Sequence, residues 1–212
     1  MQQSPPHLIG YPLTYSVDYP DRQLDRLTTG LRFLWIIPIG VIASLLATGT
    51  IFGENIYWSW QWASSGVVFL PALLMILFRQ KYPRWWFDWN LQLTRFLARV
   101  GAYGQLLRDE YPSTDEEQAV HLDFPYPDAQ QLNRWLPLVK WFLAIPHWVI
   151  LYFLYIAVFV CVVIAWFAIL FTGRYPRALF DFVVGVNRWA LRVAAYALLL
   201  VTDEYPPFSL SE

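Results

Sequence analysis

Two long apolar stretches dominate the pattern of the sequence. Residues 33–78 contain no Lys or Arg, and Glu54 is the one acidic residue among them. A membrane-spanning helix needs about 20 apolar residues, so this stretch predicts two spans, at roughly 31–51 and 61–79. The polar residues Gly53, Glu54 and Asn55 predict the turn between them.

The second stretch, residues 141–173, carries no charge at all. Extending it back to Trp135 adds only Lys140, whose ammonium group could snorkel to the membrane surface. One helix of this length would measure about 57 Å, against a hydrocarbon core of about 30 Å. The pattern therefore favours a tight hairpin that turns between Leu154 and Val160. A single long tilted helix is the alternative.

Each apolar stretch is followed by an amphipathic pattern, over residues 85–107 and 178–201. Polar side chains recur there every three or four residues and so share one face of a helix. The two stripes are Asp88, Gln92, Arg95, Arg99 and Tyr103, and then Asp181, Gly185, Arg188, Arg192 and Tyr196. Arginine in a true span is costly, so we expect both helices to lie in the headgroup plane.

The chain also repeats itself. FRQKYPRWWFDW (78–89) resembles FTGRYPRALFDF (171–182) at a shift of 93 positions, and the Ile-Pro pairs of the two stretches are shifted by 108. The first copy therefore holds about fifteen extra residues. We predict an all-α integral membrane protein of two tandem repeats, each a transmembrane hairpin followed by an amphipathic helix. The repeats are residues 11–112, the more degenerate copy, and 123–208, joined by an acidic linker at 113–122.

Composition agrees with a membrane location. Apolar residues make up 57% of the chain and charged residues 15%, against about 25% charged in soluble proteins. Lys and Arg flank the predicted spans and are absent from the predicted turns. The positive-inside rule therefore places both termini in the cytoplasm. Together with the number of spans, this predicts a multi-pass protein of the inner membrane. A net charge of −1 gives no reason to expect a nucleic-acid partner.

The arginines allow two interpretations. Arg95, Arg99, Arg188 and Arg192 could form a solvated face, or they could bind anionic lipid headgroups or a partner's acidic patch, together with Arg84 and Arg177. Asp88 and Asp181 would support such a site by pairing with the arginines, and Tyr103 and Tyr196 would complete each stripe.

Nothing in the sequence predicts catalysis. No known catalytic or nucleotide-binding motif is present, and a single cysteine, Cys161, reads as a packing residue. His147 lies in an apolar run, where it could carry protons but more often would be hydrogen-bonded inside the bundle. We therefore expect no enzyme activity, no cofactor and no metal site.

The C-terminal sequence has its own resemblance. The stretches AIPH (144–147), FTGRYPR (171–177) and DEYPPFSL (203–210) resemble a bacterial membrane family known only as a domain of unknown function, number four-three-eight-nine. The similarity is close over about 145–210 and looser over 11–112. It implies a membrane protein and brings no activity or site residues.

These patterns lead to three functional hypotheses. The first is a non-catalytic scaffold or accessory subunit that packs against other integral membrane proteins or against itself. The second is a protein that binds or handles anionic membrane lipids through the arginine stripes. The third, a channel or transporter, is disfavoured because the predicted spans hold almost no ionisable residue.

Overall fold

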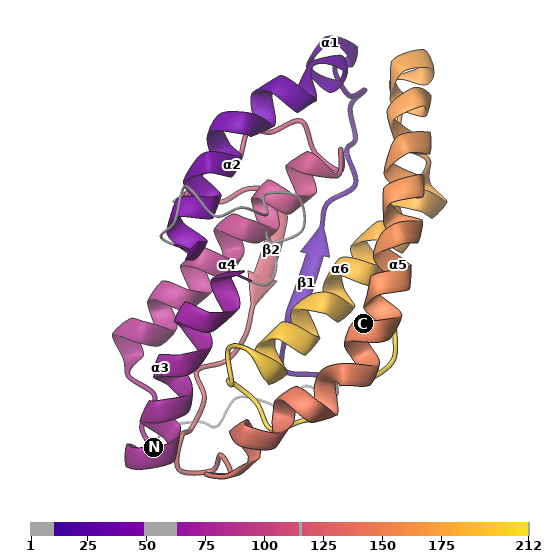
Figure 1. Ribbon diagram of the computed structural model, residues 1–212. Coiled ribbons are helices and arrows are strands. Elements are labelled where there is room, and N and C mark those ends of the chain that lie inside the picture. The colour runs from indigo at the N-terminus through magenta and orange to yellow at the C-terminus, as the bar shows by residue number, and fades with distance from the viewer. Residues whose placement is uncertain (1–10, 49–62, 115, 212) are drawn as a thin grey trace, which may run out of the picture.

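The protein is mostly helical and contains one small sheet (Figure 1). The computed structural model describes residues 11–48, 63–114 and 116–211. The elements in chain order are β1 (Thr14–Val17), α1 (Arg26–Gly30), α2 (Arg32–Thr48), α3 (Ala63–Arg79), α4 (Arg84–Gly104), β2 (Val120–Asp123), α5 (Leu136–Thr172) and α6 (Arg177–Ala197). The predicted helical character is confirmed, but an all-α fold is wrong because the two strands pair.

Strands β1 and β2 are antiparallel, with Tyr15 opposite Leu122 and Val17 opposite Val120. These four side chains are buried. Alternate positions on the other face of the sheet are exposed: Thr14, His121 and Asp123. The sequence of each strand alternates apolar and polar residues, as expected for a sheet that buries one face. Strand β2 begins within the predicted linker, 113–122, so part of that segment belongs to the folded core.

Helices α4 and α6 connect the sheet to the apolar helices. Strand β2 packs on α4 and β1 on α6, while α2 packs on α4 and α5 on α6. Each helix begins directly after the proline of a Tyr-Pro pair, Pro83 or Pro176, because proline has no N–H to continue a preceding helix. The predicted amphipathic helices are therefore confirmed as helices. Much of their apolar surface is buried within the protein.

Helix α5 is continuous over 37 residues, so the favoured hairpin is wrong. The segment between Leu154 and Val160 contains no Gly, Asn or Pro that would break a helix, and it stays helical throughout. Pro146 lies inside the helix, and Gly173 ends it with a left-handed φ of 73°. At 1.5 Å per residue, α5 is about 55 Å long.

The first half of the chain places two helices where the second half has one. Helices α2 and α3 have 17 residues each, and the turn predicted at residues 53–55 lies outside the described residues. Among the helices that the structure describes, α5 is the one long and apolar enough to cross a membrane, with a mean hydropathy of 2.9 over its most apolar 18 residues. Four spans are therefore not supported by the described helices.

Candidate functional site

The predicted arginine stripes face the strands and the chain segments that follow the helices. Arg95 donates through Nε to the backbone oxygen of Leu122 at 2.8 Å, and Arg188 donates through Nε to that of Tyr15, also at 2.8 Å. Each arginine therefore holds the strand that belongs to the other half of the chain. A carbonyl–guanidinium bond of this kind stabilises a fold by about 1.5–3 kcal/mol.

The second arginine of each stripe is more deeply buried. Arg99 is 8% exposed and donates to the backbone oxygen of Ser113 at 2.9 Å, whereas Arg192 is 3% exposed and donates to that of Ser211 at 3.0 Å. The backbone oxygen of Arg192 also accepts a bond from the hydroxyl of Tyr11. These guanidinium groups hold the segments after α4 and α6 against their helices.

The predicted supporting residues divide into two groups. Asp88 and Asp181 are exposed, and neither makes an ion pair within the described part of the chain. Tyr103 and Tyr196 are buried, and each lies beneath a cation. The guanidinium of Arg32 lies 4.3 Å from the ring centre of Tyr103, and Nζ of Lys140 lies 4.9 Å from that of Tyr196.

Both cations are buried in ion pairs that the sequence did not predict. Arg32 pairs with Asp109. Lys140 Nζ lies 2.7 Å from Asp203 Oδ1 and donates to the backbone oxygen of Thr202 at 2.7 Å. The predicted snorkelling of Lys140 is therefore wrong, because its ammonium group points into the protein. The partners lie more than 60 residues away in the sequence, where no local pattern connects them.

Arg84 and Arg177 stay exposed at the first positions of α4 and α6. Each stacks over a tyrosine from the other half of the chain: Arg84 lies 5.2 Å from the ring centre of Tyr126, and Arg177 lies 4.6 Å from that of Tyr19. These two residues keep their charged ends available to a ligand.

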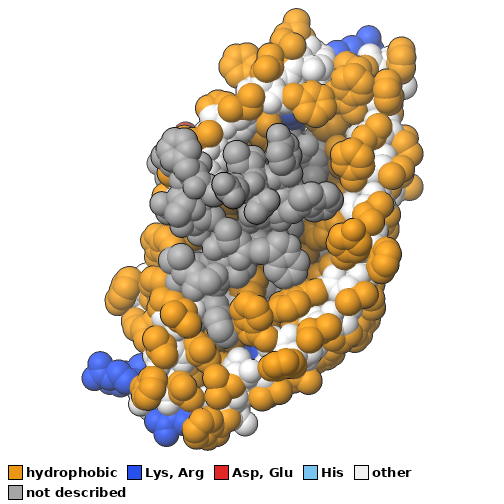
Figure 2. Space-filling view, in the orientation of Figure 1, with side chains coloured by type: hydrophobic (Ala, Val, Ile, Leu, Met, Phe, Trp, Pro, Cys, Tyr) orange, Lys and Arg blue, Asp and Glu red, His pale blue; other side chains and the backbone are white. Residues whose placement is uncertain are grey.

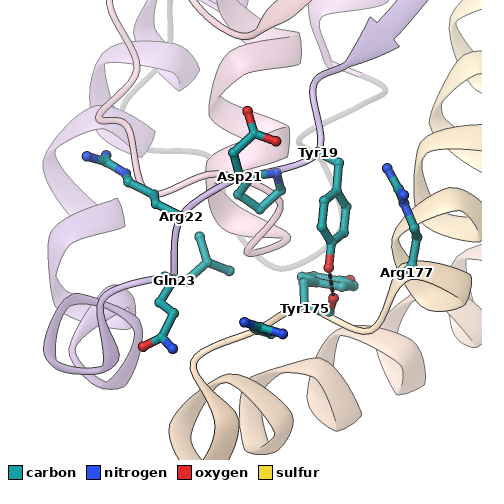
Figure 3. Close-up of a pocket in the computed structure, with 9 residues that line it drawn as sticks. Tyr19, Asp21, Arg22, Gln23, Tyr175 and Arg177 are labelled. Carbon is teal, nitrogen blue, oxygen red and sulfur yellow. Dashed lines mark hydrogen bonds between the residues drawn. The ribbon is translucent and has the colours of Figure 1, made fainter.

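A cavity of about 340 Å³ opens beside Arg177 (Figure 3). The hydroxyl of Tyr19 donates to the backbone oxygen of Tyr175 at 2.5 Å and closes one side. In Figure 3, Arg177 runs alongside Tyr19, and Arg22 and Gln23 come from the same chain segment as Tyr19, opposite the segment that carries Tyr175 and Arg177. The cavity is lined by Tyr19, Pro20, Asp21, Arg22, Gln23, Leu24, Arg174, Tyr175 and Arg177. Its three arginines outnumber its one carboxylate, so the lining is basic.

The sequence pointed to Arg177 but not to Arg22 or Arg174. The backbone N–H of Leu24 donates to the backbone oxygen of Gly173 at 2.8 Å, which joins the segment before α1 to the end of α5. This contact joins residues about 150 positions apart. Arg22, Arg174 and Arg177 have no carboxylate partner within the described residues.

His147 has a structural environment. It is fully buried, and its Nδ1 accepts a hydrogen bond from Nε1 of Trp189 at 3.1 Å. Its ring stacks on Phe208 with the centres 4.0 Å apart. The expectation that this histidine is hydrogen-bonded inside the protein is confirmed. Among the described residues, no three His, Cys, Asp or Glu side chains come together as metal ligands.

A wide apolar surface covers the face of the molecule shown in Figure 2. Helix α5 contributes most of it: only 17% of its most apolar 18 residues are buried, and Phe171 and Phe142 are 78% and 71% exposed. Helices α2 and α3 add further exposed side chains, which include Phe33, Leu34, Trp35, Ile37, Val41, Leu70, Leu74 and Phe78. An exposed apolar area of this extent marks a surface that meets lipid or another protein.

Comparison with known proteins bears on the C-terminal region. No curated protein and no solved structure matches the chain. Residues 135–209, which include α5, α6 and the segment after α6, match the model of a family described as Domain of unknown function (DUF4389).

Proposed function

We propose that this protein is a non-catalytic membrane scaffold or accessory subunit, held in the bilayer by its apolar helices. The observation that carries the proposal is the exposed face of α5, which has no charged residue from Trp141 to Thr172. Each Å² of apolar surface left in water costs about 25 cal/mol, so hundreds of Å² require a cover. Lipid and neighbouring membrane helices both provide one.

The charged side chains support the scaffold part of the proposal. The arginines of the stripes and the cations Arg32 and Lys140 bond to the backbone or to carboxylates of this chain. They fix the shape of the protein instead of forming a catalytic group of acids and bases. A rigid body with a broad apolar surface suits an assembly role.

The proposal includes a tandem duplication, which paired contacts support. The contact from Arg95 to Leu122 is equivalent to the contact from Arg188 to Tyr15. The two arginines are 93 positions apart in the sequence, and their two partners are 107 positions apart. Arg84 stacks on Tyr126 as Arg177 stacks on Tyr19, and again the arginines are 93 and the tyrosines 107 positions apart. Chance similarity of two membrane helices would not reproduce contacts of this kind. The duplicated unit then corresponds to α5 and α6 in the second copy and to α2, α3 and α4 in the first.

The test of the scaffold is gentle extraction from the native membrane, with mass spectrometry of the proteins that co-migrate. We expect a stoichiometric set of integral membrane proteins or a defined homo-oligomer. An unrelated tagged membrane protein, extracted in parallel, controls for adventitious partners. Purification as a lone monomer at every detergent concentration would overturn the scaffold role.

A second candidate function is the binding of anionic lipid, which the basic cavity favours. Arg22, Arg174 and Arg177 line it next to the end of α5, where headgroups would lie if α5 is embedded. Guanidinium groups bind phosphate through paired N–H donors. This location differs from the stripes, where Arg99 and Arg192 are buried.

The lipid function is tested by replacing Arg174 and Arg177 with Gln and measuring co-purified acidic phospholipid by mass spectrometry. We expect the acidic lipid per protein to fall several-fold. Arg26→Gln is the matched control, because Arg26 is exposed and lies outside the cavity. Equal lipid content in the double variant and in the control would exclude the cavity as the binding site.

A further inference from the structure

The orientation of the protein in the membrane is constrained first by the length of α5. The helix is about 55 Å long, whereas the hydrocarbon core is about 30 Å thick. Exposed apolar residues extend along nearly all of it, from Leu138 to Phe171. If α5 crossed the bilayer upright, its apolar ends would stand in water. A helix that lies along the membrane plane keeps the whole surface in lipid.

The position of the sheet gives a second constraint. In Figure 1 strands β1 and β2 lie about midway between the two ends of α5. The sheet has two strands and exposes Thr14, His121 and Asp123. A spanning α5 would hold this open sheet at the depth of the bilayer centre. Unpaired strand edges do not occur in contact with hydrocarbon, and a charged side chain there costs at least about 2.5 kcal/mol.

The basic residues give a third constraint. One end of α5 lies beside the end of α3, because Arg134 donates to the backbone oxygen of Phe78 at 3.3 Å. The other end lies beside the segment before α1, through Leu24 and Gly173. The first end has Arg79, Lys81, Arg84 and Arg134 nearby, and the second has Arg22, Arg26, Arg174 and Arg177. Spanning segments concentrate Lys and Arg on one side of the membrane, and this chain has them at both ends.

The face shown in Figure 2 agrees with these constraints. Hydrophobic side chains cover it outside the grey segment, Lys and Arg stand at its upper and lower edges, and hardly any acidic side chain is visible. Few of the chain's 16 Asp and Glu therefore contribute to the visible part of this face. Anionic headgroups attract a basic edge and repel carboxylates.

We propose that the protein is monotopic: α2, α3 and α5 lie in a single leaflet of a phospholipid bilayer, parallel to its surface, with both ends of α5 and the sheet on the same side. This inference rests on the membrane seating proposed above. It replaces the predicted multi-pass topology. The basic edges then meet the headgroups of that leaflet, and the exposed face of the sheet meets water.

The experiment is cysteine labelling with a membrane-impermeant maleimide, in a Cys161→Ser background that leaves no other thiol. Single cysteines replace three exposed residues: Gln130 near the start of α5, Arg174 after its end, and His121 on the sheet. Each variant is labelled in sealed cells, then after selective permeabilisation, then in detergent. Val160→Cys, in the middle of α5, is the control for lipid burial.

We expect Gln130→Cys, Arg174→Cys and His121→Cys to react from one side of the membrane and in the same step, with Val160→Cys reacting only in detergent. Labelling of Gln130→Cys and Arg174→Cys from opposite sides would overturn the single-leaflet arrangement, as would a His121→Cys that reacts only in detergent. Limited proteolysis of the unaltered chain from each side gives a second reading that needs no substitution. Absence of the protein from the membrane fraction would instead refute the membrane seating itself.

Discussion

The ion pair between Lys140 and Asp203 gives a prediction that depends on which partner is removed. The side chain of Lys140 is 1% exposed, whereas that of Asp203 is 26% exposed. Asp203→Asn leaves an ammonium group in the interior with one backbone oxygen, from Thr202, and the face of Tyr196. Removing one partner of a buried pair costs about 3–5 kcal/mol.

The opposite substitution is milder. Lys140→Met leaves a carboxylate that still reaches water and still accepts a bond from the backbone N–H of Asn133 at 2.7 Å. The loss of one hydrogen-bond partner of such an acceptor lowers the free energy of unfolding by about 1–3 kcal/mol. Asp203→Asn should therefore be the more destabilising of the two by about 2 kcal/mol. In a chain of this length the difference corresponds to roughly 4–8 °C in Tm.

The assay is thermal unfolding in detergent micelles or nanodiscs, followed by circular dichroism. The double variant should lose less than the sum of the two single losses, because its neutral partners leave no buried charge. The pair Arg32 and Asp109 is the control. Both of its side chains are nearly buried, at 4% and 12% exposed, so Arg32→Met and Asp109→Asn should cost about the same. A Lys140→Met variant that is less stable than Asp203→Asn would refute the reasoning.

Three further predictions concern the ends of helices, the strands and the tyrosines. Gln80, after α3, has a φ of 45°, a conformation that favours glycine. Gln80→Gly should therefore raise the free energy of unfolding by about 1 kcal/mol in a denaturant titration. Gly173→Ala, at a φ of 73°, should lower it by a similar amount. Arg188→Gln should increase the rate of amide hydrogen exchange in β1 and leave that of α3 unchanged. If β1 exchanges at the same rate in the variant and in the unaltered protein, the bond from Arg188 to the backbone oxygen of Tyr15 is not needed to hold the strand. Burial raises the pKa of four tyrosine hydroxyls, those of Tyr11, Tyr15, Tyr82 and Tyr175. The unfolded chain therefore loses these protons first, and stability should fall as the pH rises above about 10, measured as a decrease in Tm. The phenolate absorbance of these four tyrosines should appear only on unfolding.

Parts of this fold follow from local sequence patterns. The Tyr-Pro pairs before Arg84 and Arg177 mark the starts of α4 and α6, because proline disfavours helix in the residue before it. The alternation of buried Leu13, Tyr15 and Val17 with polar residues is a strand signal that could have been found. The favoured hairpin required a turn within 154–160, where no residue breaks a helix, so the same rules argued for a continuous α5.

The surroundings of the arginines could not be predicted in the same way. The spacing of Arg95 and Arg99 correctly places them on one face of α4, but it contains no information on what lies opposite. Leu122 comes 27 residues after Arg95, and Tyr15 comes 173 residues before Arg188. Contacts over such separations depend on the tertiary arrangement, as does the cavity between the segment before α1 and the start of α6.

The exchange of strands between the two halves has a consequence for assembly. Strand β1 is held by Arg188 and β2 by Arg95, so each half, produced alone, would present a stripe without its strand and a strand without its partner. On the duplication proposed above, a protein with one such unit would be complete only as a dimer with interlocked arms. Joining both halves in one chain replaces that bimolecular encounter by an effective concentration in the millimolar range. The linker therefore makes the pairing of the two halves independent of how many molecules the membrane contains.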